Sequence, residues 1–439
     1  MQAHPNHACP WVLRSLAAAL TSAGACGAWA QEADPSPYYI GASLGYTHDT
    51  NVSNTAGGVG DNYSTAGLIG GFDQAIGRQR LHANARVSYS RYQTETQYNN
   101  TSYGVSAGWN WATINNLSGN VEATANQGLA SLANTSGLPT TNGDKNLVKT
   151  DQVSTSVLWG GVGDLGIQGS YAHSRVKYTG AESATSESSS DSGSVGTFYR
   201  VGPTLKLGID LRFSRTYSPY AQVRASAPPA PTPPATRPLD DYDPNTANGR
   251  NIDLTADWQA SPDASLNTRL SWTRQTNSTS TNLDFSGLTG AVSARYKLSP
   301  KTNFVASFNR NAGTNAAFYT FIPTTTTTGS TTPTAGAPET VLSQTSQTTN
   351  SFSLGADYLA TAKISLKIDG SYQRAKLIDA NNGETDENTR IASLGLNYAG
   401  GRNWSVGCNI SYSSRSASGV SANSYSATST GCTAQVTLR

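Results

Sequence analysis

The sequence has no long apolar segment. None of its runs reaches the ~18 residues that a transmembrane helix needs, and no long amphipathic helix pattern is present. Charge is scarce as well, since 13% of the 439 residues are Asp, Glu, Lys or Arg and the net charge is only +2. A nearly neutral chain lacks the electrostatic attraction on which nucleic-acid binders depend, so we expect no nucleic-acid partner.

Residues with reactive or metal-binding side chains are also rare. The chain has four cysteines and five histidines, without the spacing of a metal site, so we expect neither a metal nor another cofactor. His48 and Asp49 are adjacent, but neighbours on a strand point to opposite faces and cannot form one catalytic cluster. The sequence therefore predicts that the protein is not an enzyme.

The first thirty residues have the pattern of a signal peptide. Arg14 precedes an apolar stretch at 16–25, and Ala28-Trp29-Ala30 is a small-residue cleavage site. Lipidation of Cys26 is the competing interpretation. In both cases the protein is exported, with residues 1–30 as the signal and 31–439 as the mature chain.

What the sequence has in abundance is alternation. Between Arg78 and Tyr92, the apolar residues Leu81, Ala83, Ala85, Val87 and Tyr89 alternate with His82, Asn84, Arg86, Ser88 and Ser90. Side chains on a strand point alternately to opposite faces, so one face of this segment is apolar and the other polar. The pattern recurs along the chain and predicts an all-β fold: a transmembrane, antiparallel, up-and-down β-barrel of about 18 strands.

Short turns rich in Gly, Pro and Asn alternate with longer connections. In bacterial barrels the short turns face the periplasm, and an even number of strands leaves both termini there. Two connections are unusually long: 218–249, which contains the proline-rich tract Ala227–Pro234, and 313–349, which is rich in Thr. We expect both to be extracellular loops of a protein in the outer membrane.

Aromatic residues on the apolar face fall into two groups. One group lies beside the short turns: Trp111, Trp159, Tyr199, Trp258, Tyr296, Tyr358, Tyr398 and Trp404. The other lies toward the long connections: Tyr46, Tyr89, Tyr171, Phe213, Trp272, Phe308, Tyr372 and Tyr412. Amphipathic rings favour membrane interfaces, so these groups predict two aromatic girdles in contact with lipid and lipopolysaccharide.

The polar face lines the predicted lumen and carries charges of both signs. The pore-lining candidates are His82, Arg86, Glu122, Lys206, Asp210, Arg212, Asp253, Asp257, Arg269, Arg295, Asp357, Lys367 and Asp369. Their functional interpretation is a path for a polar solute or polymer. The alternative is a network of ion pairs and hydrogen bonds that fills the barrel, and the near balance of signs argues against strong ion selectivity.

The two cysteines of the mature chain, Cys408 and Cys432, both fall on the lipid-facing side. A hairpin folded near Val420 places them directly opposite each other, at a Cα separation of about 4.5–5.5 Å, which a disulfide bridges. We therefore predict a Cys408–Cys432 disulfide.

Two short motifs resemble a known family. The segment Tyr46-Thr-His-Asp-Thr-Asn-Val52, together with Gly77-Arg-Gln-Arg-Leu81 and Arg91-Tyr92, resembles outer-membrane β-barrel porins that accompany exopolysaccharide biosynthesis operons, the EpsL-like group among them. The resemblance implies a role in polysaccharide export or assembly, with the polymer and export-system proteins as partners. Alternatives are a general diffusion porin and a structural or adhesive surface barrel. The barrel assembly machinery is a further expected partner, although the chain ends on Leu438-Arg439 and not on an aromatic residue.

Overall fold

The computed structural model describes residues 37–438. Its gaps are 131–144, 162, 164, 181–183, 185, 225, 227–237, 280–282, 313–318, 322–338, 342–345, 379–383, 402 and 420–423. The predicted signal peptide with Cys26, and the tract Ala227–Pro234, lie outside the described residues. Within the described part of the chain, no helix is long and apolar enough to cross a membrane.

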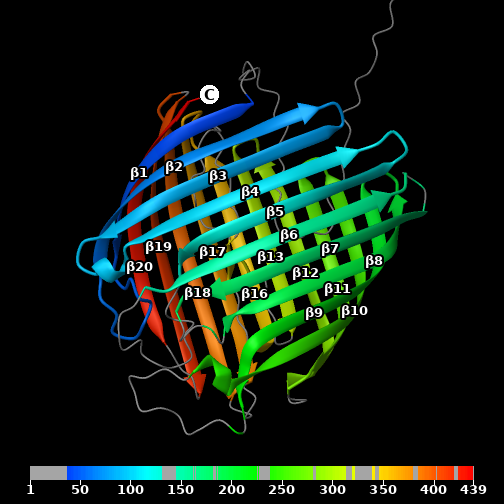
Figure 1. The fold of residues 1–439 in the computed structure, drawn as a ribbon. Coiled ribbons are helices and arrows are strands. Elements are labelled where there is room, and N and C mark those ends of the chain that lie inside the picture. Colours follow the sequence, from blue (N-terminus) through cyan, green and yellow to red (C-terminus); the bar gives the residue numbers. More distant parts are fainter. Residues whose placement is uncertain are drawn as a thin grey trace, which may run out of the picture.

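Eighteen strands form one closed antiparallel barrel (Figure 1). They are β1 (Tyr38–Asp49), β2 (Asp61–Ile76), β3 (Gln79–Tyr92), β4 (Asn100–Ala112), β5 (Leu117–Leu129), β6 (Leu147–Trp159), β7 (Leu165–Tyr178), β8 (Ser188–Val201), β9 (Leu205–Val223), β10 (Tyr242–Ser261), β11 (Ala264–Asn277), β12 (Phe285–Ser299), β13 (Thr302–Ala312), β16 (Ser346–Leu359), β17 (Ile364–Ile378), β18 (Glu384–Ala399), β19 (Trp404–Gly419) and β20 (Tyr425–Leu438). Each strand pairs with its neighbour in the chain, and β1 closes the ring by pairing with β20. The predicted architecture is confirmed.

Alternation determines which face of each strand meets lipid. On β3, the outward side chains of Leu81, Val87 and Tyr89 are exposed, whereas Ser88 and Ser90 point inward. The same alternation holds on the paired strands β2 and β4, so the outward rows join into a continuous apolar surface. An exposed apolar surface of this extent is stable only in contact with lipid.

Both predicted aromatic groups lie on this outward face. Trp159, Tyr199, Trp258, Tyr296 and Trp404 are exposed beside the short turns. At the other end, Tyr46, Tyr89, Tyr171, Phe213, Trp272, Phe308, Tyr372 and Tyr412 are exposed in the same way. The two sets define girdles at opposite ends of the apolar surface, as a barrel that spans a bilayer requires.

The short turns need backbone conformations that glycine supplies. Ile76 pairs with Gln79 across a two-residue turn, in which Gly77 has a φ of +60°. Gly202 joins β8 to β9 with a φ of +66°. Side chains with a Cβ rarely adopt this left-handed region, so glycine fits both turns.

The expected loop at 218–249 is shorter than predicted. Strand β9 continues to Val223 and β10 already begins at Tyr242, so both strands extend well beyond the girdle. The sequence pattern ends at the girdle because outward residues above it need no longer be apolar. Pairing continues there through a register shift between Asp243 and Asn245, where Pro244 has no N–H to donate.

The second long connection is bounded by strands β13 and β16. Two short segments within it, β14 (Tyr319–Phe321) and β15 (Glu339–Val341), pair with each other in a separate two-stranded sheet. Residues 346–349, assigned to this loop from the sequence, belong to β16. The extracellular position of both connections remains a prediction.

Cys408 and Cys432 are directly opposite in the β19–β20 register, and a disulfide joins them. Their outward neighbours Val406, Ile410 and Ala434 belong to the lipid-facing surface. The bond therefore links the two strands of the last hairpin, of which β20 also forms the seam with β1.

We expect non-reducing mass spectrometry of the mature protein to find the disulfide as a mass two hydrogens below that of the dithiol. The closed loop should stabilise the fold by about 3 kcal/mol, because it restricts the unfolded chain. A Cys408→Ser, Cys432→Ser variant should lose that amount in denaturant unfolding. Free thiols that alkylate quantitatively without reductant would contradict the bond.

Candidate functional site

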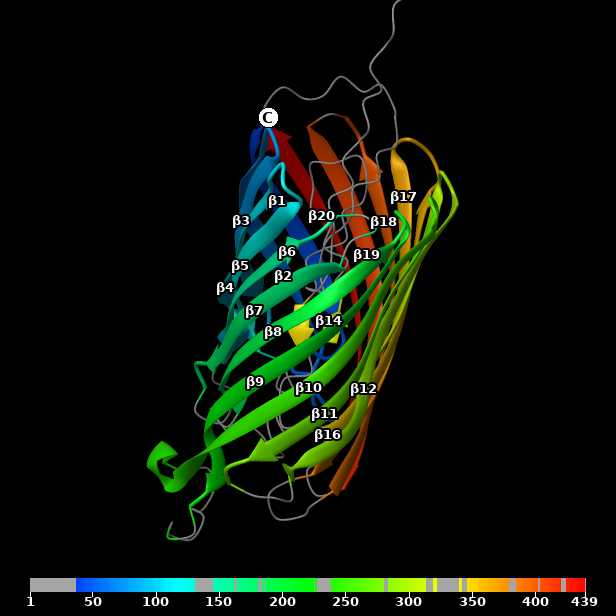
Figure 2. The same ribbon diagram turned by 90° about the vertical axis from the view of Figure 1, so that its right-hand side faces the viewer.

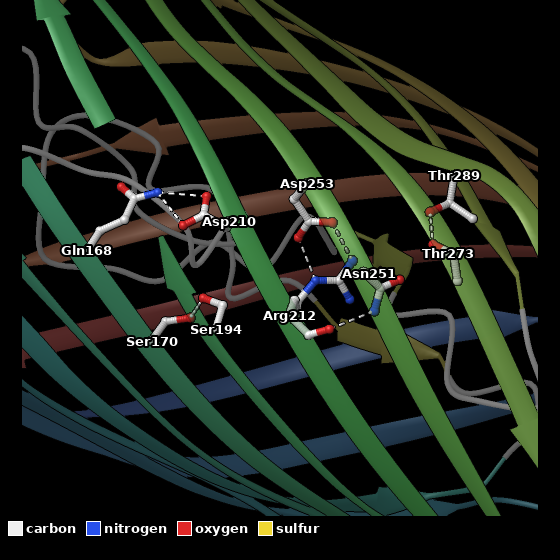
Figure 3. A network of polar contacts seen from close by, with 9 residues as sticks. All are labelled: Gln168, Ser170, Ser194, Asp210, Arg212, Asn251, Asp253, Thr273 and Thr289. Carbon is white, nitrogen blue, oxygen red and sulfur yellow. Dashed lines mark hydrogen bonds and ion pairs between the residues drawn. The ribbon is translucent and has the colours of Figure 1, made fainter. Parts of the chain in front are cut away.

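The candidate site is the inner wall formed by strands β7 to β12. Figure 2 shows these strands running obliquely along one side of the barrel, and Figure 3 shows polar side chains that they carry. Between the girdles, the outward positions of these strands carry no charged side chain, so the charged side chains of this region lie on the inner face. We call the connected set Gln168, Lys206, Asp210, Arg212, Asp253 and Asp257 the lumen network.

Arg212 and Asp253 form the strongest link of the lumen network. The guanidinium donates from Nε to Oδ2 at 2.7 Å and from Nη2 to Oδ1 at 3.1 Å (Figure 3). Asp253 is only 1% exposed, so this bidentate ion pair is withdrawn from water on the carboxylate side. Asn251 donates to the backbone oxygen of Arg212 at 3.4 Å. Arg212 is therefore held as part of the wall and is not a free pore cation.

Asp210 lies directly opposite Asp253 in the β9–β10 register, so two buried carboxylates face each other. The side-chain nitrogen of Gln168 lies 2.7 Å from each carboxylate oxygen of Asp210. Gln168 is on β7 and Asp210 on β9, so this contact crosses the whole of β8. It is possible because Gly196, the β8 residue in register between them, has no side chain.

Two cations near the short turns, Arg200 and Lys206, lie over the ring of Phe198. Phe198 points inward and is 1% exposed. Over the face of its ring lie Lys206 Nζ, 4.8 Å from the ring centroid, and Arg200 Cζ, 5.1 Å from it. Lys206 also forms an ion pair of 3.6 Å with Asp257. Cations are attracted to the face of an aromatic ring. Sequence analysis missed Phe198, although its position next to outward Tyr199 gives it inward parity.

A second group of predicted pore-lining residues lies on β16 and β17. Lys367 forms an ion pair of 3.6 Å with Asp369 on its own strand and lies opposite Asp357 on the next. Arg295 has inward parity on β12, and Arg269 on β11 lies between this group and the lumen network.

Nearer the long connections, Arg415 donates to Glu387 at 2.7 Å, an inward ion pair that sequence analysis did not identify.

The wall formed by β3 to β5 is different. His82 and Glu122 lie on either side of Gly108, and a side chain at that glycine would overlap the His82 ring. Gly104 likewise leaves space for Arg86. Arg86 is exposed, as is Arg295 on β12, whereas Lys206 and Lys367 are buried. Of the predicted pore-lining cations, Arg86 and Arg295 are therefore the two that are open to water in the lumen.

The motif at 46–52 has a structural role. Asn51 is 6% exposed and donates to the backbone oxygens of Thr55 at 2.8 Å and Ser426 at 3.1 Å. Its own N–H donates to Asp49 at 2.8 Å. These bonds fix the first connection against β20, which explains the Asp-x-Asn spacing without a ligand.

The side chains of His48 and Asp49 form no hydrogen bond with each other. Its ring nitrogen lies 2.9 Å from the side-chain oxygen of Asn62, and the two neighbours point to opposite faces of β1. Among the described residues, no group of three or more His, Cys, Asp or Glu side chains could hold a metal ion. The polar wall offers charges and hydrogen bonds to a passing solute.

These features define a transmembrane β-barrel with a polar, charged lumen wall.

Comparison with protein-family models finds no match, and comparison with curated proteins finds none either. Among solved structures, the fold is similar to OccK1 (OpdK) of Pseudomonas aeruginosa, with a TM-score of 0.44 and 10% identity over 91% of this chain and 99% of that one. OccK2 (OpdF) of the same organism has 12% identity and a TM-score of 0.44, covering 91% and 97%. OccAB4 of Acinetobacter baumannii has 10% identity and a TM-score of 0.41, covering 91% and 98%.

The Gly196 gap provides a test of the lumen network. In Gly196→Ala, the new Cβ would lie 2.2 Å from both Asp210 Oδ1 and the Ile209 backbone oxygen, so the Gln168–Asp210 contact must break or β9 must move. We expect a loss of about 1–3 kcal/mol in denaturant unfolding. Gly370→Ala is the matched control, because nothing lies within 4 Å of its added Cβ. Equal stability of the two variants would show that the network does not constrain the wall.

Proposed function

We propose that this protein is an outer-membrane diffusion pore for small polar solutes. The observation that carries the proposal is the closed barrel with charges of both signs along its inner wall. Such a wall replaces part of the hydration of a polar solute without retaining one sign of charge. In this proposal the short turns and both termini face the periplasm.

The pairing of the lumen charges supports weak ion selectivity. Arg212 is matched by Asp253, Lys206 by Asp257 and Lys367 by Asp369. The fields of paired charges largely cancel a few ångströms away, so these residues favour neither anions nor cations strongly. Among the described residues, the exposed Arg86 and Arg295 form no comparable buried pair, and they should give the pore a modest preference for anions.

Polysaccharide export is the second candidate. It rests on the resemblance of the segments Tyr46–Val52 and Gly77–Leu81 to porins of exopolysaccharide operons. Asn51 in the first segment seats a loop, and Gly77 in the second forms a tight turn, so both motifs are explained by folding alone. The diffusion pore is therefore the better-supported candidate.

Purified protein in a planar bilayer should give steady conductance with weak selectivity. Arg86→Glu reverses an exposed charge inside the lumen and should raise the cation-to-anion permeability ratio by at least about twofold. Arg374→Glu makes the same change on the outward face and should leave the reversal potential unchanged. The absence of conductance, or equal effects of both variants, would contradict the proposed path.

A deletion strain distinguishes the two candidate functions. The diffusion pore predicts slower uptake of small polar nutrients at limiting concentration, with normal polymer secretion. Polymer trapped in the periplasm, together with unchanged uptake, would favour export instead.

A further inference from the structure

One repeated pattern on the outward face is not explained by a solute path. On five strands, the girdle aromatic nearest the long connections is followed two residues later by arginine, in Tyr89-Ser-Arg91, Phe213-Ser-Arg215, Trp272-Thr-Arg274, Phe308-Asn-Arg310 and Tyr372-Gln-Arg374. Residues two apart share a face, so each arginine lies outward, directly beyond the aromatic ring. All five arginines are exposed. We call this set the arginine belt.

At the other end of the barrel, five strands that run toward the short turns lack this pattern. Two residues beyond Tyr199, Trp258, Tyr296, Tyr358 and Tyr398 stand Val201, Ala260, Leu298, Ala360 and Gly400. Solubility alone would favour charge beyond both girdles. The asymmetry therefore indicates that the two membrane surfaces differ in charge, and that the arginines face the more anionic one.

One member of the belt, Arg274, belongs to a pair of like charges. Arg250 on β10 lies directly opposite Arg274 on β11, and both are outward and exposed. Like charges directly opposite on antiparallel strands destabilise the pair. Neither arginine forms an ion pair within the described residues, whereas Arg215 lies opposite Asp191. The repulsion is relieved when an anion lies between the two guanidinium groups.

The position of this pair identifies the kind of anion. Trp272, two residues from Arg274, is exposed in the girdle, and tryptophan rings occupy the headgroup level of a bilayer. The next outward position therefore lies among the headgroups, where lipid phosphates are found. Guanidinium forks bind phosphate oxygens in a bidentate manner, and lysine, a point charge, fits this geometry less well.

We propose that the arginine belt together with Arg250 binds phosphate groups of the glycolipid headgroups in the leaflet that faces the long connections, and that the Arg250–Arg274 pair is the principal site. The site rests on the outer-membrane location in the proposed function, but not on the solute that crosses the lumen. Binding neutralises the Arg250–Arg274 repulsion and fixes the height of the barrel in the membrane.

Native mass spectrometry of the full-length mature protein in detergent tests this site, with diphosphorylated lipid A as the probe. Arg250→Gln with Arg274→Gln should weaken lipid A retention by about 30-fold, because each cation near an anionic lipid surface raises the affinity about fivefold. Lys301→Gln with Lys363→Gln removes two exposed charges at the short turns and should leave retention unchanged. Each variant is first checked for the wild-type β-sheet circular dichroism.

Two results would overturn the proposal: wild-type retention by the Arg250, Arg274 variant, or equal retention of fully dephosphorylated lipid A by the wild-type protein. Bilayer conductance of the same variant separates this result from the proposed function. Conductance should stay at the wild-type level, since neither arginine faces the lumen. If lipid retention does not change while conductance persists, the lipid site fails and the pore stands.

Discussion

The structure depends on one constraint: in lipid, every backbone N–H and C=O must find a partner within the protein. A sheet satisfies this requirement only when it has no free edge, and here β1 supplies the closure by pairing with both β2 and β20. The pairing of β1 with β20 extends from Ile40 opposite Leu438 to Asp49 opposite Ser429. The Cys408–Cys432 disulfide lies next to this seam and holds the last hairpin in the register that closure needs.

Closure also decides where polar groups lie. The outward positions are occupied by apolar side chains, so charges in the transmembrane region must gather inside, where they lie close to one another. Opposite charges on neighbouring strands pair with each other, as Arg212 does with Asp253. Glycine stands where a long side chain crosses the neighbouring strand. Gly196 lets Gln168 reach Asp210, and Gly104 gives space to Arg86. The same inward residues provide the polar path that the proposed pore uses.

Much of this architecture could be predicted from the sequence, because alternation and girdle position are local properties. The parity of Leu81 or Arg212 follows from its neighbours alone, and the Cys408–Cys432 contact follows from a single hairpin. The partners of the lumen residues could not be predicted in this way. They depend on the register across several strands, so the contact of Gln168 with Asp210 over Gly196 has no local signal. The extension of β9 and β10 beyond the girdle was missed for a related reason, since polar residues above the membrane carry no apolar alternation.

The central claim is that one face of each strand meets lipid while the other meets water in the lumen. Spin labels attached to single cysteines along β3 test it directly in reconstituted bilayers, through collisions with oxygen, which dissolves in lipid, and with a water-soluble nickel chelate. Labels at Ala83, Ala85 and Val87 should respond to oxygen, and labels at Asn84, Arg86 and Ser88 to nickel. The account predicts accessibilities that alternate with a period of two residues and opposite phase for the two reagents. Uniform accessibility along the strand, or alternation with the phase reversed, would contradict it.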